Sequence, residues 1–230
     1  MLTTPEVATQ VHFEEGRGTL AGITAGKALV ECSTLDAGTM QSFEAAVKKL
    51  NGEFLEAPVS GSKGPAEQGT LIFLCAGSKK TFDALVDNDL KAMGKASFFL
   101  GDSAGKGSHM KLVVNMIMGG MMGCLAEGAS LAQAADLKLD DLGQILDLGA
   151  MSNPMFRGKL PNMAAGKFDP NFPLKHQQKD MKLAVELGDE LHQPLAVCSS
   201  ANELFKRARA MGHGDEDFCS VIHATTIKKE

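Results

Sequence analysis

The stretch that most constrains the fold begins near Gly105, where a short segment rich in lysine and glycine gives way to a long apolar run without proline. Residues 109–137, HMKLVVNMIMGGMMGCLAEGASLAQAADL, carry few charges and predict one long helix of about eight turns. Because this run is apolar all round, we expect it to be buried on most sides. Glycines at positions 119, 120, 123 and 128 would weaken the helix in water, so we expect another helix to pack closely there.

The residues before this helix alternate between short apolar runs and amphipathic stretches. KALVECST (27–34), EFLEAPVSG (53–61, strand-like up to Pro58), GTLIFLCAGS (69–78) and KASFFLG (95–101) predict strands. DAGTMQSFEAAVKKLNG (36–52), which Asp36 could cap, and KKTFDALVDNDLKAMG (79–94) predict helices. We therefore expect an α/β domain over residues 1–104.

The remainder of the chain shows helical patterns alone. After the long helix, amphipathic patterns recur at residues 139–151, 153–164, 177–192 and 196–212, and no strand signal follows Leu100. We expect residues 105–230 to form an all-helical domain for substrate binding and oligomerisation. The apolar surface around Gly119–Met122 and an open sheet edge favour a homo-oligomer or a subunit of a larger complex.

Composition excludes several classes of protein. The chain has 230 residues, 44% of them hydrophobic and 22% charged, and a net charge of −5, which argues against a general nucleic-acid or anionic-membrane surface. Its five cysteines form no C-x-x-C pair, so neither a zinc site nor a disulfide framework is indicated. We expect no membrane-spanning stretch. The polar start shows no signal peptide, so we expect the cytoplasm or the interior of a plastid or mitochondrion.

Three stretches carry side chains suited to chemistry. APVSGS (57–62) places a tight turn with two hydroxyls after a strand, which suits a carboxylate, although such pairs usually form ordinary turns. Lys111 and Asn115 are four apart and share a helix face. A helix N-terminus and burial both disfavour the charged form of Lys111, which would let it donate a proton near neutral pH. The plainer interpretation is a solvated lysine in the first turns.

The third stretch is FPLKHQQKDMKLA (172–184), in which three lysines recur at helical spacing. A charged helix face is the commonest explanation of such spacing. His109 and His176 lie in different segments, and isolated histidines of this kind are far more often structural than metal-binding, so we assign no metal.

Taken in order, APVSGS, GKGSHMKLVVN (105–115) and PLKHQQKDMKLA (173–184) resemble the β-hydroxyacid dehydrogenases. Within that family they are most similar to the plant-type glyoxylate/succinic semialdehyde reductases. ECSTLDAGT, LDLGAMSNPMF and DFCSVIHA also fit, so the resemblance covers nearly the whole chain. It implies that the protein transfers a hydride from NADPH to a small aldehyde acid, either glyoxylate or succinic semialdehyde.

The resemblance also implies roles for particular residues. Lys111 would be the catalytic acid, and Asn115 would orient it. The substrate-binding residues would be Ser60, Gly61, Ser62, Phe172 and Asp180. The cofactor-binding residues would be Leu2, Thr34 and Lys179.

One departure from the family concerns the cofactor. The family begins with a strand, a G-x-G-x-x-G turn and a helix that bind the pyrophosphate, whereas the early glycines here form EEGRG (14–18). We therefore expect a partial Rossmann-type (doubly wound) domain that lacks its first mononucleotide-binding half and binds NADPH weakly alone. Three explanations stay open: truncation, natural loss, or supply by another chain.

The alternative function follows from that departure. An inactive, truncated homologue could act as a structural or binding component of a larger assembly. A non-enzymatic nuclear relative of the family acts with chromatin. This chain keeps the catalytic-type Lys111 and lacks a basic region, which makes the nuclear role the least favoured reading.

Overall fold

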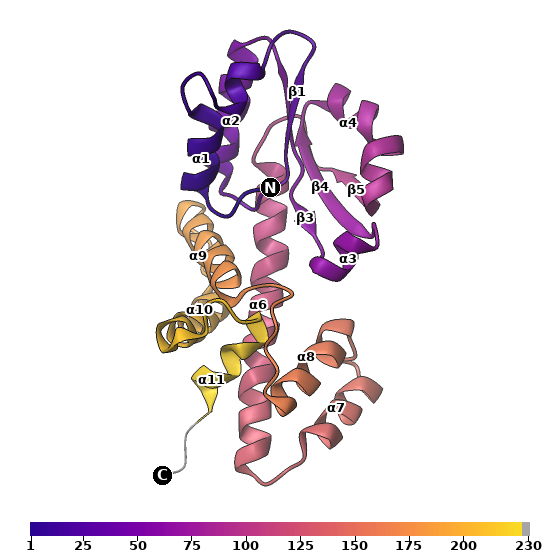
Figure 1. Ribbon diagram of the computed structural model, residues 1–230. Helices are drawn as coiled ribbons and strands as arrows, with labels where there is room; N and C mark the ends of the chain where they lie inside the picture. Colours follow the sequence, from indigo (N-terminus) through magenta and orange to yellow (C-terminus); the bar gives the residue numbers. More distant parts are fainter. Residues whose placement is uncertain (227–230) are drawn as a thin grey trace. The chain divides into compact units, whose positions relative to one another are not determined.

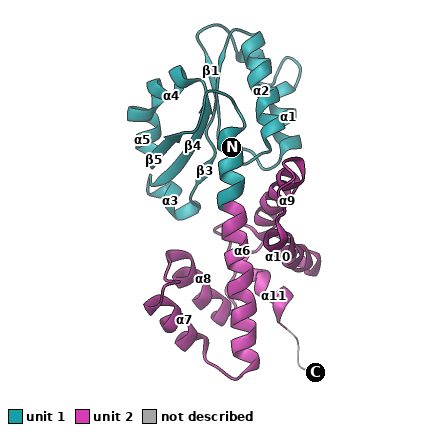
Figure 2. Ribbon diagram, turned by 180° about the vertical axis from the view of Figure 1, so that it is seen from behind, with its two compact units in different colours: residues 1–114 teal, residues 115–230 magenta. Residues whose placement is uncertain are grey.

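The structure is a computed structural model that describes residues 1–226. It divides into two compact units, with the boundary between Val114 and Asn115 (Figure 2). The first unit combines a sheet with helices, and the second is helical (Figure 1).

The first unit contains five strands, whereas the apolar runs predict four, because the run at residues 53–61 forms two short strands that flank Pro58. They are β1 (Ala28–Glu31), β2 (Glu53–Glu56), β3 (Val59–Ser60), β4 (Leu71–Gly77) and β5 (Gly94–Phe99). The helical elements are α1 (Pro5–Phe13), η1 (Thr19–Gly22), α2 (Ala37–Lys49), α3 (Lys63–Glu67), α4 (Lys79–Leu85), the π-helical turn η2 (Val86–Leu90) and α5 (Lys91–Met93). The predicted cap of α2 is confirmed, because the Asp36 carboxylate accepts the backbone N–H of Thr39 at 2.7 Å.

The sheet is mixed, which differs from the mostly parallel sheet of a doubly wound fold. β1 pairs with β2 in parallel, and β4 pairs with β5 in parallel. β4 runs antiparallel to both β2 and β3, which follow one another along the same side of β4. Only residues 61–70 join β3 to β4, and a parallel crossover needs about a dozen residues or more.

Helices cover both faces of this sheet (Figure 1). Successive strand residues point to opposite faces, so the neighbours Phe54 and Leu55 belong to different cores. Phe54 packs with α1 and α2, where the buried residues are Ala8, Ile23, Leu35, Met40, Phe43, Val47 and Ala104. Leu55 packs with the α4 side, where the buried residues are Ala57, Phe73, Cys75, Phe82 and Leu90.

The helix α6 (Lys106–Ala134) has 29 residues and confirms the predicted long helix. Its burial is less complete than its composition predicts, because Val113, Ile117 and Leu131 are exposed. The expectation for its glycines holds at Gly119 and Gly123, which lie against residues of α9 and α10. At the other two glycines, an added Cβ would meet nothing within 4 Å.

By length and composition alone, α6 is also apolar enough to cross a membrane. This corrects the expectation that no stretch of the chain meets that test. The interior helix of a water-soluble protein meets it as well. In α6 the packing of Gly119 against α9 and the buried polar side chains of Lys111 and Asn115 account for the helix without a bilayer.

The second unit continues α6 and adds shorter helices. They are α7 (Leu139–Leu148), α8 (Pro154–Ala165), α9 (Leu174–Glu190), α10 (Ala196–Ala208), the π-helical turn η3 (Arg209–His213), η4 (Phe218–Val221) and α11 (Ile222–Thr225). α7 packs against α8, and α9 packs against α10. Among the described residues after Phe99, the extended pairing is one isolated bridge between Pro173 and Asp217, so the predicted all-helical character is confirmed.

Candidate active site

The end of β1 is fixed by a buried carboxylate. Glu31 accepts hydrogen bonds from the backbone N–H of Ser33 at 2.7 Å and from its hydroxyl at 2.5 Å. His12 Nε2 donates to the other oxygen of Glu31 at 2.6 Å. Burial raises the pKa of Glu31, but the hydrogen bonds from His12 and Ser33 outweigh burial and lower it to about 2. The carboxylate therefore stays ionised and holds the chain that leads to Thr34.

The same group of residues holds the N-terminal segment. The backbone N–H of Leu2 donates to the Ser33 hydroxyl at 2.6 Å, next to Thr34 in the chain. Leu2 and Thr34, both predicted to bind the cofactor, therefore both lie next to Ser33, just beyond the carboxyl end of β1. In open α/β sheets, ligands bind beyond the carboxyl ends of the strands, so this placement fits a dinucleotide.

The Ser60–Gly61–Ser62 turn connects β3 to α3. Gly61 has φ +126°, a conformation that favours glycine. A Cβ at this position would lie 2.9 Å from Leu71 Cδ2 and 3.0 Å from Pro65 Cβ. Ser62 occupies the N-cap position of α3 without a capping hydrogen bond from its side chain. The turn therefore combines a tight backbone with a hydroxyl that α3 does not use, as a carboxylate site requires.

The start of α6, which carries Lys111, is anchored by Glu56. This fully buried residue ends β2, and its carboxylate accepts the backbone N–H groups of Gly105 at 2.6 Å and Gly107 at 2.7 Å. The hydroxyl of Ser108 donates to it at 2.8 Å. A carboxylate at a helix N-terminus is stabilised by the helix dipole and the unpaired N–H groups. This contact fixes the start of α6 against the sheet. Lys111, further along the same helix, is 6% exposed.

Glu56 was not among the residues predicted from the sequence. Burial raises the pKa of Glu56, while the hydrogen bonds from Ser108, Gly107 and Gly105 oppose that rise. An acidic residue that ends a buried strand is a signal that could have found it, because such a charge needs donors. Its role is to position α6.

A second polar group lies between α6 and α9 within the helical unit. Asn115 Nδ2 donates to Asp180 Oδ2 at 2.6 Å. Gln177 Nε2 donates to the Asn115 carbonyl at 2.9 Å, and Lys179 Nζ lies 2.9 Å from Asp180 Oδ1. That last contact is an ion pair without hydrogen-bond alignment, because Asp180 Oδ1 has no hydrogen-bond partner among the described residues. Asn115, Asp180 and Lys179, which were predicted to have separate roles in the site, are thus neighbours, and the unpredicted Gln177 lies beside them.

Phe172 precedes α9 on a segment held by Asp217. The Asp217 carboxylate accepts the backbone N–H groups of Asn171 at 3.0 Å and Phe172 at 3.3 Å. Lys159 Nζ lies 2.7 Å from the same carboxylate. The backbone N–H of Phe218 donates to the Phe172 carbonyl at 2.9 Å. The backbone of Phe172 is therefore held in place, and its half-buried ring lies against that of Phe218, with centroids 5.8 Å apart.

The predicted residues fall into groups within the two units. Leu2, Thr34, the Ser60–Ser62 turn and Lys111 belong to the first unit, while Asn115, Phe172, Lys179 and Asp180 belong to the second. Lys111 and Asn115 lie one turn apart on the single helix α6.

Comparisons with known proteins identify the family of the chain. The model for the NAD-binding domain of NADP-dependent 3-hydroxyisobutyrate dehydrogenase matches residues 105–225, and the model for the NAD-binding domain of 6-phosphogluconate dehydrogenase matches residues 1–101. Glyoxylate/succinic semialdehyde reductase 1 of Arabidopsis thaliana is 49% identical over 230 residues, which are all of this chain and 78% of that protein. The chain belongs to the β-hydroxyacid dehydrogenase family.

Other relatives in the comparisons include an enzyme and a nuclear protein. The chloroplastic glyoxylate/succinic semialdehyde reductase 2 of Arabidopsis thaliana is 44% identical over 229 residues. The human cytokine-like nuclear factor N-PAC is 39% identical over 207 residues. This β-hydroxyacid dehydrogenase chain spans 63% of the former and 37% of the latter, so neither comparison covers the whole relative.

A crystal structure of 3-hydroxyisobutyrate dehydrogenase from Salmonella typhimurium has the same fold. Its TM-score is 0.88 at 28% identity, and the match covers 96% of this chain and 76% of that one. The α/β layer followed by a helical domain is thereby confirmed. The predicted loss of the first mononucleotide-binding half is not confirmed, because a dinucleotide-binding model matches residues 1–101. The alternative of an inactive, truncated component has no support in these comparisons.

Proposed function

We propose that this β-hydroxyacid dehydrogenase reduces glyoxylate or succinic semialdehyde to the corresponding hydroxy acid and uses NADPH. The observation that carries the proposal is the burial of Lys111, which is 6% exposed near the start of α6. An amine is rarely buried in a core without a role, because removing its charge from water is costly. The 49% identity to glyoxylate/succinic semialdehyde reductase 1 supports the choice of substrates.

The proposed chemistry assigns the proton to Lys111. Bound NADPH would supply the hydride. As the hydride reaches the aldehyde carbon, negative charge develops on the carbonyl oxygen, and the Lys111 ammonium stabilises that charge and donates its proton. Asn115, one turn along α6, orients the lysine, while its own side chain is held by Asp180 at 2.6 Å. Burial keeps water from competing for the developing charge.

The substrate carboxylate is assigned to the Ser60–Gly61–Ser62 turn. Backbone N–H groups and hydroxyls in such a turn bind anions through several hydrogen bonds. Phe172 and Asp180 would contact the rest of the substrate. A site with these parts favours small acids, because the carboxylate and the aldehyde carbon must reach the turn and Lys111 together.

The cofactor is assigned to the carboxyl end of β1. Leu2 and Thr34 would hold the nicotinamide end, and Lys179 would supply a positive charge. Residues 1–226 contain no G-x-G-x-x-G turn for the pyrophosphate, so we further propose that these residues alone bind NADPH weakly. The proposed assembly is a homo-oligomer or a subunit of a larger complex. Of the surface expected to form it, Gly119 and Met122 are buried within the chain, so the contact would use exposed apolar side chains such as Met121 and Leu131. The cytoplasm or an organelle interior remains the proposed location.

The direct test measures binding and turnover separately. Purified protein is titrated with NADPH and with NADH by fluorescence, and oxidation of the cofactor is then followed with glyoxylate and with succinic semialdehyde. We expect preference for NADPH and turnover of at least one of the two aldehyde acids. NADPH binding without turnover of either acid would refute the substrate assignment. Equal turnover of an aldehyde that lacks a carboxylate would refute the role of the serine turn.

A further inference from the structure

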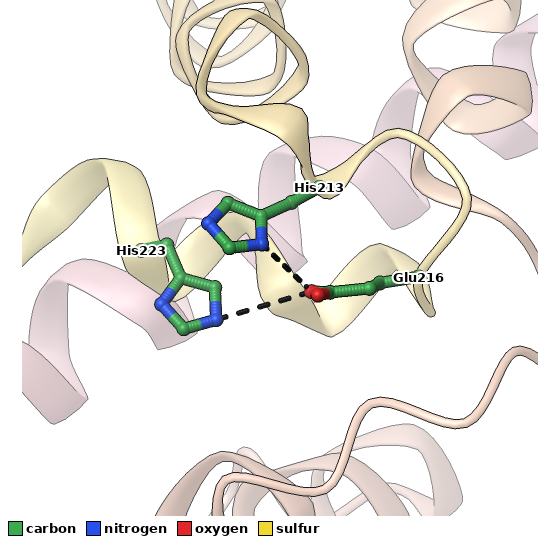
Figure 3. Close-up of side chains that lie close together, drawn as sticks. All are labelled: His213, Glu216 and His223. Atoms are coloured by element: carbon green, nitrogen blue, oxygen red, sulfur yellow. Dashed lines mark hydrogen bonds and ion pairs between the residues drawn. The ribbon is translucent and has the colours of Figure 1, made fainter.

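Two histidines and a glutamate converge at the C-terminal end of the described chain. His213 Nδ1 lies 3.0 Å from Glu216 Oε2, and His223 Nε2 lies 3.9 Å from the same oxygen (Figure 3). The ligand atoms of the three residues all lie within 4.8 Å of one another. The side chains are 23%, 35% and 38% exposed for His213, His223 and Glu216. No role in the proposed reductase chemistry involves them.

The backbone around this cluster is fixed by contacts with the start of α9. The Glu216 carbonyl accepts the backbone N–H of Leu174 at 2.8 Å, and the Gly214 carbonyl accepts that of Lys175 at 2.9 Å. Gly212 turns the chain with φ +99° directly before His213. The three side chains therefore project from anchored segments, as Figure 3 shows.

We propose that His213, Glu216 and His223 form a binding site for a divalent transition metal ion, with Zn²⁺ as the best match. Imidazole nitrogen and carboxylate oxygen are the donors that zinc combines in three-ligand sites, with water in the fourth position. Mg²⁺ and Ca²⁺ prefer oxygen ligands, so two imidazoles select against them. Among residues 1–226, the ion pairs of Glu216 are the two with these histidines.

The distances are close to those that a metal ion imposes. Bonds of about 2.0–2.1 Å to a tetrahedral ion place neighbouring ligand atoms about 3.3 Å apart. The 3.0 Å distance between His213 Nδ1 and Glu216 Oε2 is slightly shorter than this value, and the 3.9 Å distance between His223 Nε2 and Glu216 Oε2 is longer. Binding therefore requires His223 Nε2 to approach Glu216 Oε2 by well under 1 Å. It also requires the two histidine nitrogens, which lie within 4.8 Å of one another, to reach about the same separation.

The rings must also tilt. The His213 and His223 rings are stacked, with centroids 3.9 Å apart and planes 16° from parallel, whereas the lone pairs that bind a metal lie in the ring planes. The torsion that turns an imidazole has a broad energy well, and both histidines are partly exposed. The Phe168 ring, whose centroid lies 4.8 Å from that of the His223 ring, limits the direction in which the His223 ring turns.

A metal ion at this site would connect two segments near the end of the described chain. His213 ends η3, directly after α10, and His223 belongs to α11. A shared ion would tie these two segments together. Because metal binds the folded arrangement in preference to the unfolded chain, it would stabilise the fold.

Metal binding is tested on the full chain after treatment with a chelator. Calorimetric titration with Zn²⁺ alone should show one ion bound per chain and a raised melting temperature. His213→Gln, Glu216→Gln and His223→Gln should each weaken binding at least tenfold. The matched control is His192→Asn, which changes an exposed histidine elsewhere and keeps a residue that tolerates its φ of +54°. This control should bind Zn²⁺ as the wild type does.

Two further measurements keep the test decisive. Co²⁺ added to the wild type should give the visible absorption of a four-coordinate ion with nitrogen and oxygen ligands. Sulfur-to-cobalt charge transfer would place the ion on a cysteine such as the exposed Cys124 and overturn the proposal. Absent saturable binding, or unchanged binding in the three variants, would overturn it as well. If a variant fails to fold, anomalous diffraction from zinc-soaked wild-type crystals decides whether an ion lies among these side chains.

Discussion

Asn115 and Asp180, 65 positions apart in the chain, are joined by a hydrogen bond of 2.6 Å from amide to carboxylate, and each is 2% exposed. Forming this hydrogen bond and removing one of its partners have effects of different size on the stability of the fold. The bond itself contributes modestly to stability, because both groups would otherwise bond to water. Removing one partner leaves the other buried and unsatisfied, which costs more.

The first prediction concerns that pair. Asp180→Ala should lower the free energy of unfolding by about 1–3 kcal/mol, because the Asn115 amide loses its acceptor. The control is Asp189→Ala, which removes an exposed carboxylate from the same helix α9. It should change the free energy of unfolding by less than about 0.5 kcal/mol. Urea denaturation measures both. A double-mutant cycle with Asn115→Ala that shows no coupling would contradict the structural pairing.

The second prediction concerns the proton donor. Lys111→Ala should lower kcat by roughly two to four orders of magnitude, the usual contribution of general acid catalysis, with a smaller effect on KM. Lys106→Ala is the control, because Lys106 is exposed at the first position of α6. It should leave kcat nearly unchanged. Equal losses in both variants, measured by NADPH oxidation, would mean that the catalytic lysine is misassigned.

The third prediction contrasts two neighbouring glycines in α6. A Cβ on Gly119 would lie 2.4 Å from Gln177 Nε2 and 2.6 Å from Met181 Sδ. Gln177 could move only by giving up its bond to the Asn115 carbonyl, so Gly119→Ala should destabilise the fold by about 1–3 kcal/mol. A Cβ on Gly120 would meet nothing within 4 Å. Gly120→Ala should therefore stabilise the fold by up to about 1 kcal/mol. Equal shifts in the urea midpoint would contradict this helix packing.

The fourth prediction concerns acid stability. The pKa of Glu31 is lowered from 4.5 to about 2, so its ionised form contributes stability that is complete above about pH 4.5 and is lost as the pH falls towards 2. The unfolding free energy of the wild type should therefore fall more steeply across that window than that of Glu31→Gln. Urea unfolding at several pH values below 5 measures the difference. A constant gap between the two proteins would show that Glu31 does not titrate with folding.

Much of the secondary structure could be predicted because it depends on local patterns. The apolar runs that became β1 and β4, the cap at Asp36 and the long helix α6 all follow from side chains a few positions apart. The direction of β4 could not be predicted in the same way, because apolar content does not distinguish parallel from antiparallel pairing. The short connection after Ser60 was the available sign.

The polar contacts were harder to predict because they join distant segments. Glu56 accepts hydrogen bonds from residues at the start of α6, about 50 positions away in the chain. The residues next to Glu56 in the sequence do not indicate that partner. The burial of Gly119 and the openness of Gly120 depend on the rotation of α6 against α9, which the uniform apolar composition of α6 leaves undefined. The roles predicted for Lys111 and Asp180 rest on the family resemblance, since their spacing alone also fits a charged surface.

The continuity of α6 has a consequence for dividing the protein into modules. Domains usually meet in exposed, flexible linkers, but here the boundary between Val114 and Asn115 falls inside a regular helix. A cut at that peptide bond would sever helical hydrogen bonds and separate Lys111 from Asn115. A chimera that exchanges the helical part with a relative should therefore be joined in the loop at residues 101–105, where the two family matches also divide, so that the lysine travels with the helix that carries it.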